Sequence, residues 1–385
     1  MTRVRSVELR LVRLPLVRPF RTSFGEARDK ECILARVETD DAEGWGECVA
    51  GAEPDYSEEW NAGAWLVLRD LLAPALISAG DVEPDTVEGV LAFVRGNPMA
   101  KATLIDAFLD AHLRALGRSL AEHLGGTRHR VECGVSVGIQ PSTEALLELV
   151  AVYLGEGYRR IKLKIEPGLD VERVRAVRHA HPDILLSVDA NAAYTLDDAG
   201  VFRDLDECNL LMIEQPLHHD DVVEHAKLQA LIRSDLCLDE SVRSAADAGA
   251  AIELGACRIV NVKQGRVGGV PESKRVHDVC ASQNVPVWCG GMLETGIGRA
   301  TNLAVAAMPN FTLPGDISAS RRYFAEDLTE PFELGPGGTM AVPTGLGIGV
   351  EPDPSRLEAA TVRVERVGKS DKTGSSGLTE NRRTS

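Results

Sequence analysis

Five charged side chains recur at nearly equal intervals through the middle of this chain. They are Lys164, Asp189, Glu214, Asp239 and Lys263, separated by 25, 25, 25 and 24 residues. Each ends, or nearly ends, a short apolar run typical of a buried strand. A repeat of about 25 residues has room for one strand, one helix and two loops, the unit of a parallel β/α array. The spacing therefore predicts that the five charges share the rim at the carboxyl ends of the strands, where barrel active sites lie.

The pattern around these residues predicts a barrel that follows a smaller domain. Residues 1–50 have the pattern of a strand meander and residues 57–124 that of helices, which predicts an α+β capping domain over 1–130. Strands and helices then alternate over 131–325, with about eight strands and seven helices, one helix short of a full eightfold barrel. The helices are expected at 142–157, 170–180, 195–206, 221–233, 244–254, 270–282 and 296–308, with late strands near 285–289 and 311–315.

The end of the chain is expected to leave the barrel. Residues 326–367 include a stretch rich in Gly and Pro at 340–349, and we expect them to return to the capping domain. Residues 368–385 have the composition of a disordered tail.

Composition excludes several classes of partner. A formal net charge of −16 with no basic cluster argues against binding to nucleic acid or to an anionic membrane surface. No apolar run approaches the roughly 20 residues of a membrane helix, and the first residues lack a hydrophobic signal core, so a cytoplasmic location is expected. The 8 cysteines are scattered singly, which favours reduced, buried thiols over disulfides or zinc ligands.

Three carboxylates at the ends of consecutive strands predict a metal ion. Asp189, Glu214 and Asp239 would repel one another without a neutralising cation, and ligands that are all oxygen suit Mg²⁺ or Mn²⁺ better than zinc. Each acid alone could instead be a helix N-cap or a loop residue. Asn191 could bridge metal and substrate, or could itself be an N-cap.

The lysines predict proton transfer. Lys162 and Lys164 lie on one face of a strand, where two ammonium groups disfavour each other's charge and leave Lys164 competent as a base. Lys263 would lie across the rim from Lys164, with the metal between them. A cation that holds a substrate carboxylate would stabilise the enolate left by removal of the α-proton. Arg266 is close enough in sequence to tune Lys263, or could bond a backbone carbonyl; a solvated surface charge is the alternative for either lysine alone.

The motifs around these residues resemble a known family. The sequence is similar to the o-succinylbenzoate synthase / N-succinylamino acid racemase family of the enolase superfamily, in its muconate-lactonizing branch, from about residue 4 to 352. The motifs that carry the resemblance are the Lys-x-Lys strand and Pro19-Phe20-Arg21-Thr22-Ser23-Phe24-Gly25, Gly44-Trp45-Gly46-Glu47-Cys48, Val188-Asp189-Ala190-Asn191, Ile213-Glu214-Gln215-Pro216, Leu238-Asp239-Glu240-Ser241, Val262-Lys263, Gly265-Arg266-Val267-Gly268-Gly269, Trp288-Cys289-Gly290-Gly291-Met292-Leu293-Glu294-Thr295-Gly296 and Leu313-Pro314-Gly315-Asp316.

The resemblance implies a fold, a cofactor and a site. It implies an α+β cap on a modified TIM barrel, (β/α)7β, with Mg²⁺ on Asp189, Glu214 and Asp239 and with Lys164 and Lys263 as catalytic lysines. In the synthase reaction Lys164 would take the α-proton and return it to the leaving hydroxyl, giving o-succinylbenzoate for menaquinone biosynthesis. In racemisation the two lysines would exchange roles. The substrate's succinyl group would be surrounded by Phe20, Tyr56, Ser136, Gly291, Met292 and Leu293, although apolar packing alone would also explain Phe20 and Leu293.

Related activities remain as alternatives. A dipeptide epimerase or a muconate cycloisomerase would keep the same five charged residues, and a noncatalytic metal-binding barrel would be expected to lack one of them. A sugar-acid dehydratase would be expected to end its seventh strand with His, whereas Trp288 and Cys289 stand there. Arg266 resembles the residue of the subfamily that contains racemases, which favours a promiscuous enzyme. Related enzymes often assemble as homo-oligomers, so a homo-oligomer that acts on a small-molecule carboxylate is expected.

Overall fold

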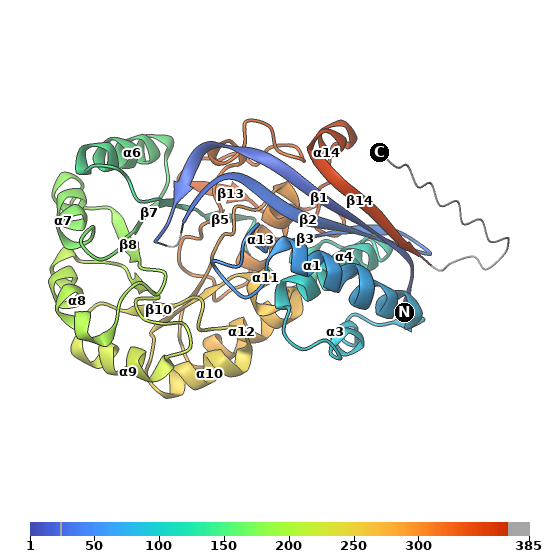
Figure 1. The fold of residues 1–385 in the computed structure, drawn as a ribbon, viewed down its shortest axis with the longest axis horizontal. Helices are drawn as coiled ribbons and strands as arrows, with labels where there is room; N and C mark the ends of the chain where they lie inside the picture. Colours follow the sequence, from blue (N-terminus) through green and yellow to red (C-terminus); the bar gives the residue numbers. More distant parts are fainter. Residues whose placement is uncertain (24, 369–385) are drawn as a thin grey trace, which may run out of the picture.

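Two large sheets organise the computed structural model, which describes residues 1–23 and 25–368 (Figure 1). The first sheet is antiparallel and has the order β14-β1-β2-β3, with β4 paired to β1. Its strands are β1 (Thr2–Arg21), β2 (Glu26–Thr39), β3 (Glu43–Cys48), β4 (Asp81–Val82) and β14 (Thr361–Gly368). Alternate residues of β2 face opposite sides, as the pleat requires. Ile33 and Ala35 pack with the helices of the capping domain, whereas Cys32 and Leu34 belong to the apolar cluster that extends into the barrel.

Helices cover one face of this sheet. They are α1 (Asn61–Val67), η1 (Leu68–Leu72), α2 (Ala73–Ser78), α3 (Val87–Leu91), α4 (Pro98–Ala115) and α5 (Leu120–His123). Two glycines let β3 lie directly on α4. A Cβ added at Gly44 would lie 2.2 Å from the carbonyl oxygen of Ala107, and one added at Gly46 would lie 2.1 Å from that of Thr103. Side chains at these two positions would push the helix off the sheet.

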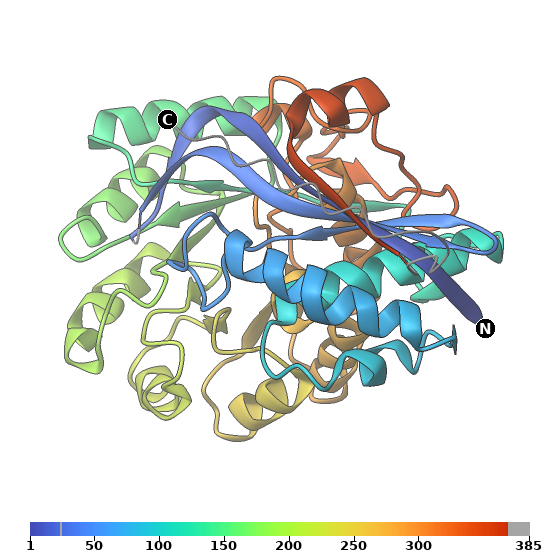
Figure 2. The same cartoon turned by 45° about the vertical axis from the view of Figure 1, so that its right-hand side comes forward.

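The second sheet is parallel and curls into a barrel. Its order is β12-β11-β10-β9-β8-β7-β6, and α6 to α10 form an arc around it (Figures 1 and 2). The strands are β6 (Gly134–Val137), β7 (Arg160–Lys164), β8 (Leu185–Asp189), β9 (Ile213–Glu214), β10 (Leu236–Leu238), β11 (Ile259–Val262) and β12 (Val287–Cys289). The helices are α6 (Thr143–Glu156), α7 (Val171–Ala180), η2 (Leu196–Asp198), α8 (Ala199–Leu205), η3 (Asp206–Cys208), α9 (Val222–Leu231), α10 (Ala245–Glu253), α11 (Gln264–Val267), α12 (Val270–Ser282) and α13 (Gly296–Ala306).

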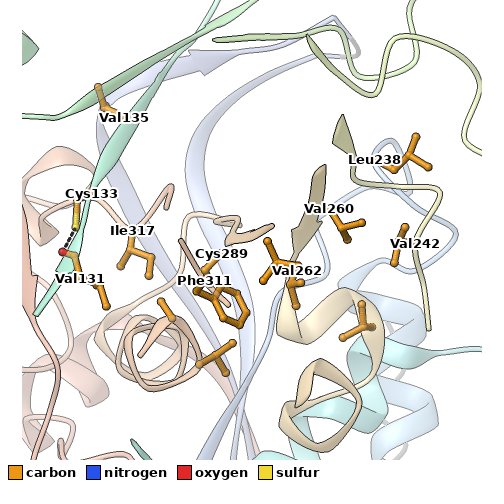
Figure 3. Close-up of a cluster of buried hydrophobic side chains, with 14 of the residues drawn as sticks. Val131, Cys133, Val135, Leu238, Val242, Val260, Val262, Cys289, Phe311 and Ile317 are labelled. Atoms are coloured by element: carbon orange, nitrogen blue, oxygen red, sulfur yellow. Dashed lines mark hydrogen bonds between the residues drawn. The ribbon is translucent and has the colours of Figure 1, made fainter. Parts of the chain in front are cut away.

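The two faces of the barrel strands differ in character. On β11, Val260 and Val262 belong to the large apolar cluster between strands and helices, part of which is drawn in Figure 3. Asn261, between them, faces the interior and donates to Glu214. The barrel interior therefore combines a small apolar cluster around Trp288 with charged side chains from several strands.

The prediction of an eighth strand near 311–315 is wrong, because this segment does not form a strand. The segment instead makes two isolated parallel bridges, Phe311 to Val287 of β12 and Gly315 to Cys133 beside β6. Because these partners lie at opposite edges of the seven-stranded sheet, the segment spans the gap between the edges and closes the barrel. Pro314 has no amide N–H for a ladder, which explains why the pairing is interrupted.

The last described segment runs back along the capping domain. After η4 (Ser320–Arg322), β13 (Thr339–Ala341) pairs with β5 (Arg130–Glu132), and α14 (Pro354–Ala360) leads into β14. The amide of Ile348 donates to Asp110 of α4 at 2.8 Å. The exact domain boundaries stay predictions. Gly368 ends β14 and so does not begin a tail, and residues 369–385 lie outside the described residues.

Two expectations from composition can be compared with the fold. All 8 cysteines are buried and free, as predicted. Across residues 1–23 and 25–368, no helix has both the length and the apolar character needed to cross a membrane.

Candidate active site

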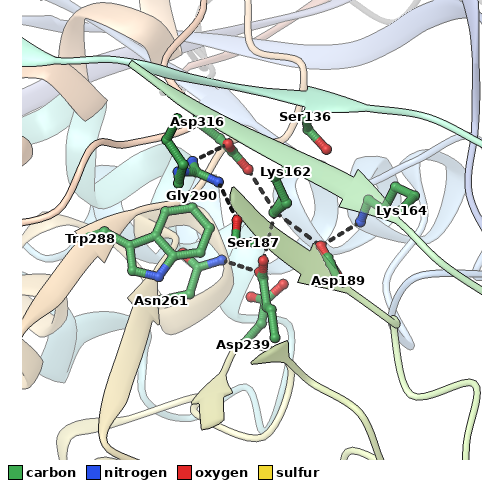
Figure 4. A network of polar contacts seen from close by, with 12 residues as sticks. Ser136, Lys162, Lys164, Ser187, Asp189, Asp239, Asn261, Trp288, Gly290 and Asp316 are labelled. Carbon is green, nitrogen blue, oxygen red and sulfur yellow. Dashed lines mark hydrogen bonds and ion pairs between the residues drawn. The ribbon is translucent and has the colours of Figure 1, made fainter. Parts of the chain in front are cut away.

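The five regularly spaced charges lie at the carboxyl ends of five adjacent strands. Lys164, Asp189 and Glu214 are the last residues of β7, β8 and β9, and they are register partners of one another along the sheet. Asp239 and Lys263 directly follow β10 and β11. The structure thus places all five on one rim, as the spacing predicts, and Figure 4 shows three of them, Lys164, Asp189 and Asp239. None of the three acids is a helix N-cap, because Thr195, Asp221 and Ser244 are the N-caps of the helical segments that follow Asp189, Glu214 and Asp239.

Lysines of β7 hold the first two acids. Lys164 donates to Asp189 Oδ2 at 2.7 Å, and the Lys162 ammonium lies 3.0 Å from the same oxygen and 2.8 Å from Glu214 Oε2 (Figure 4). Burial acts to raise the pKa of Asp189, but the charges of Lys162 and Lys164 outweigh it and the pKa is lowered. Glu214 is buried beside Asp189, and burial followed by that neighbouring charge raises its pKa. Asn261 donates to the other oxygen of Glu214 at 2.7 Å.

Lys162 lies deeper than the sequence pattern suggested. Its ammonium is 2.6 Å from Asp316 Oδ2, and Arg160 forms an ion pair with the other oxygen of Asp316. Burial acts to lower the pKa of Lys162, but Asp189, Asp316 and Glu214 outweigh it and raise the pKa. Three carboxylates therefore surround Lys162 and compensate its charge. The expected repulsion between the ammonium groups of Lys162 and Lys164 is thus not the main influence on Lys162.

Arg160 and Asp316 were missed as site residues by sequence reasoning. Arg160, Lys162 and Lys164 occupy alternate positions of one strand and so share a face, a period of two that could have revealed Arg160. Its guanidinium lies 4.7 Å from the ring centroid of Trp288, which covers the floor of the site. Asp316 follows the segment that closes the barrel, and no local pattern indicated that it would reach Lys162.

The opposite lysine has partners from both domains. Lys263 donates to Asp239 Oδ2 at 2.7 Å and to the hydroxyl of Tyr56 at 2.9 Å. Burial acts to lower the pKa of Lys263, but Tyr56, Glu240 and Glu214 outweigh it and raise the pKa. Arg266 forms an ion pair with Asp239 and donates to the carbonyl oxygens of Asn261 and Val242 at 2.7 and 3.1 Å. It therefore pairs with the acid that Lys263 contacts and also bonds backbone carbonyls. That Arg266 tunes Lys263 stays a prediction.

Asn191 lies between Lys164 and a further acid. Its side-chain oxygen accepts from Lys164, and its amide nitrogen donates to Glu240 Oε1 at 2.8 Å. The N-cap alternative is wrong, since Thr195 precedes the next helical segment. Glu240 was also missed. It follows Asp239 directly, burial raises its pKa, and its second oxygen has no hydrogen-bond partner among the described residues.

A cavity of about 450 Å³ opens onto this rim. Lys162, Lys164, Asn191 and Lys263 line it, and so do the six residues expected near a succinyl group, Phe20, Tyr56, Ser136, Gly291, Met292 and Leu293. The three acids and Arg266 are buried and are not part of this lining. The loop after β12 reaches the floor through Gly290, where an added Cβ would lie 2.3 Å from Asn261 Oδ1.

The donor set fits a hard divalent cation. Asp189, Glu214 and Asp239 are fully or almost fully buried on adjacent strands, offer only oxygen ligands, and lie beside the unsatisfied oxygens of Glu240 and Asn261. In this structure lysine and arginine side chains contact the three acids. A separate group of possible metal ligands lies in the loop after β9. It consists of His218, His219 and Asp220, whose ligand atoms all lie within 4.8 Å of one another.

Comparison with known proteins identifies the family of this chain. Two family models match the chain, the mandelate racemase / muconate lactonizing enzyme N-terminal domain over residues 5–125 and the enolase C-terminal domain-like model over 145–356. An N-succinylamino acid racemase from an Amycolatopsis species is 56% identical over 363 residues, which cover 94% of this chain and 98% of that protein. The chain belongs to the N-succinylamino acid racemase / o-succinylbenzoate synthase family of the enolase superfamily.

Other members of the family are consistent with this assignment. An o-succinylbenzoate synthase from Geobacillus kaustophilus is 49% identical and covers 92% of this chain and 95% of its own length. The crystal structure of an enolase superfamily member from Listeria innocua superposes with a TM-score of 0.91 at 41% identity, over 95% of this chain and 99% of that one. The expected resemblance and the expected fold, a capping domain on a modified barrel, are therefore confirmed.

Proposed function

We propose that this protein removes the α-proton of a carboxylate substrate with lysine, in a Mg²⁺-dependent reaction, as an o-succinylbenzoate synthase, an N-succinylamino acid racemase or both. One observation carries the proposal. Lys164 and Lys263 end strands four places apart, line the same cavity, and stand on either side of the row Asp189, Glu214 and Asp239. Two amines on opposite sides of one site can remove a proton from a carbon and return one to it.

The acids are the proposed metal ligands. Mg²⁺ held by Asp189, Glu214 and Asp239, or Mn²⁺ with the same ligand preference, would stabilise the negative charge that develops on the substrate carboxylate and would take over the acids that pair with the lysines here. Asn261 and Lys162 keep Glu214 in position, and Arg266 does so for Asp239. These contacts fix the ligands before substrate enters.

The two reactions use the lysines differently. In the synthase reaction, Lys164 as a free amine takes the α-proton, and as an ammonium it returns that proton to the departing hydroxyl, which leaves as water. Lys263 stays protonated and stabilises the enolate. In racemisation, one lysine takes the α-proton and the other donates a proton to the opposite face of the same carbon. Tyr56 and Asp239 orient Lys263, and Asn191 and Asp189 orient Lys164.

The test is exchange at the α-carbon. We expect purified protein with Mg²⁺ to racemise N-succinyl-phenylalanine in D₂O with uptake of one deuterium, and to dehydrate the synthase substrate. Proton NMR measures the deuterium uptake and circular dichroism measures the racemisation. Lys164→Ala and Lys263→Ala should each abolish racemisation. Lys274→Ala is the matched control, because Lys274 is half exposed and its ion-pair partner within residues 1–23 and 25–368 is Asp278 on α12.

The outcomes separate the candidates. Dehydration without any exchange on the amino acid would mean a dedicated synthase. Silence with both substrates, together with epimerisation of a dipeptide or cycloisomerisation of muconate, would overturn the assignment in favour of those relatives. Catalysis that survives both lysine substitutions would contradict the lysine mechanism itself.

The remaining expectations concern the setting of the enzyme. We infer a small-molecule carboxylate as substrate, a homo-oligomeric assembly and a cytoplasmic location. Neither nucleic acid nor a membrane is expected as a partner, because the net charge is −16 and the described helices include no membrane span.

A further inference from the structure

The capping domain contributes a positively charged side chain to the cavity that the proposed chemistry does not use. Lys30 lies on β2, and its side chain is buried although it lines the cavity. On β2 it occupies the same face as Cys32 and Leu34, which pack toward the barrel. The ammonium of Lys30 donates to the carbonyl oxygen of Met292 at 2.9 Å. It therefore stands where the capping domain meets the loop after β12.

Lys30 differs from the other cations of the cavity in its partners. Arg13 and Arg28 pair with Glu31 and Glu26, and the three barrel lysines pair with the acids of the rim. Among the described residues, no carboxylate lies within 4.0 Å of the Lys30 nitrogen. An ammonium has three donors, and one of them is used by Met292. A buried cation without a counter-ion is costly, so its position favours binding of an anion that enters the cavity.

The buried acid Glu47 does not supply that counter-ion. Its carboxylate accepts hydrogen bonds from the hydroxyl of Thr295 at 2.7 Å and the amide of Gly298 at 3.0 Å, and so caps α13. Lys30 acts through space to lower the pKa of Glu47, but burial acts more strongly and raises it. Other acids that line the cavity, such as Asp29 and Asp55, are exposed, and water weakens their influence on a bound ligand.

We propose that Lys30 binds the second carboxylate of the substrate, the terminal carboxylate of its succinyl group. The inference rests on the proposed function, in which the other carboxylate of the substrate lies at the rim between Lys164 and Lys263. One cavity would then hold a dicarboxylate between a barrel end and a cap end. A dipeptide carries an ammonium group at its distal end, which Lys30 would repel, so the same residue would select against the substrates of a dipeptide epimerase.

The test compares two ligands that differ only in this charge. N-succinyl-phenylalanine is paired with the analogue whose succinyl carboxylate is replaced by the primary amide, which has the same shape. Both are measured as substrates and, by calorimetry with Mg²⁺ present, as ligands. For wild type we expect a preference for the dicarboxylate of about tenfold to a hundredfold, the range for a charged hydrogen bond. Lys30→Met should remove most of this preference through KM and Kd, and Lys30→Arg should retain it.

Arg28→Met is the matched control. Arg28 lines the same cavity with one positive charge, but it is exposed and paired with Glu26. Its substitution should leave the ratio between the two ligands unchanged. If Lys30→Met weakens the binding of both ligands equally, Lys30 only supports the loop at Met292. If Arg28→Met lowers the preference for the dicarboxylate as much as Lys30→Met does, the preference comes from the overall positive charge of the cavity. Either result overturns the proposal.

Binding and turnover separate this proposal from the proposed function. Protein that binds the dicarboxylate in a Lys30-dependent way without turning it over would retain the Lys30 site and refute the activity. Racemisation with no preference between the two ligands in wild type would retain the activity and refute the Lys30 site. If Lys30→Met does not fold, the wild-type ratio and the Lys30→Arg ratio still decide.

Discussion

Asp106 of α4 should make the stability of this protein fall as the pH rises toward neutrality. Its carboxyl is buried between the capping domain and the barrel, where Oδ1 accepts from the amide of Val270 at 2.9 Å and Oδ2 has no partner among the described residues. Burial raises the pKa of Asp106 from 3.8 to about 7. The amide of Val270 acts in the opposite direction and the charge of Glu88 adds to the rise, but burial dominates.

The direction of the effect follows from proton binding. The folded protein keeps this proton up to about pH 7, whereas the unfolded chain releases it near the ordinary carboxyl pKa of 3.8. The contribution of Asp106 to stability is therefore complete below about pH 4 and is lost as the pH rises through 7. About 3 pKa units at 1.36 kcal/mol each give a ceiling of about 4 kcal/mol for this loss.

Asp106→Asn isolates this contribution. Asparagine can still accept from Val270, but it carries no charge at any pH. We expect the Tm of the variant, relative to that of wild type, to rise between pH 5 and pH 8 by up to about 3 °C, because about 2 of the 3 pKa units fall in this range and a chain of this length shifts by about 1 °C per kcal/mol. Thermal melts of both proteins in matched buffers from pH 5 to 8 measure the difference at each pH.

The control and the refuting result concern the dependence on pH. Asp278 is half exposed, and its pKa is lowered, since its hydrogen bonds to Lys274 and His277 outweigh the effect of burial. Asp278→Asn should therefore show no gain that grows between pH 5 and 8. A constant offset between Asp106→Asn and wild type across this range, or a loss at pH 8, would refute the argument that buried Asp106 is charged at a cost.

Two further predictions test the packing of the cap and the metal site. Gly46→Ala places a Cβ against the carbonyl of Thr103, so we expect a loss of about 1–3 kcal/mol in a thermal or urea denaturation, whereas Gly89→Ala, with open space around its Cβ, should be almost neutral. Removal of divalent metal with a chelator should abolish α-proton exchange, and Mg²⁺ or Mn²⁺ should restore it. Asp239→Asn should strongly weaken the restoration of exchange by metal. His219→Ala should leave it unchanged, because His219 belongs to the separate group in the loop after β9. A loss in His219→Ala but not in Asp239→Asn would mean that the metal binds in that loop instead.

Residues that repeat along the sequence were predictable, and residues that meet through tertiary contacts were not. The row from Lys164 to Lys263 was evident because strand ends in a parallel barrel share one rim. Helix positions were also evident from apolar spacing, although the segment expected at 195–206 divides into a 3₁₀ turn, Leu196–Asp198, before α8. Asp197 and Asp198 stand in that first turn, where acidic residues suit a helix start.

The remaining site residues depend on where distant segments meet. Asp316 reaches Lys162 only because the segment before it closes the barrel with two bridges rather than a strand. Glu240 is turned toward Asn191 by the loop after β10, and nothing in its local sequence indicates that contact. Lys30 lies in an alternating strand in which a lysine usually faces water. It is buried because the loop after β12 lies against it, which is a property of the packed domains and not of the strand.

The capping domain fixes the same loops that carry the chemistry. Glu47 caps α13, which follows the loop of Gly291 to Leu293, and Asp106 accepts from the first residue of α12, which follows the turn after Lys263. Tyr56 bonds Lys263 itself. A shift of the capping domain would therefore disturb Lys263, one of the two proposed catalytic lysines, and the loop against Lys30 together. These three contacts would couple the proposed binding at the cap end to the proposed proton transfer at the barrel end, and a substrate held at both ends would favour the packed arrangement of the two domains.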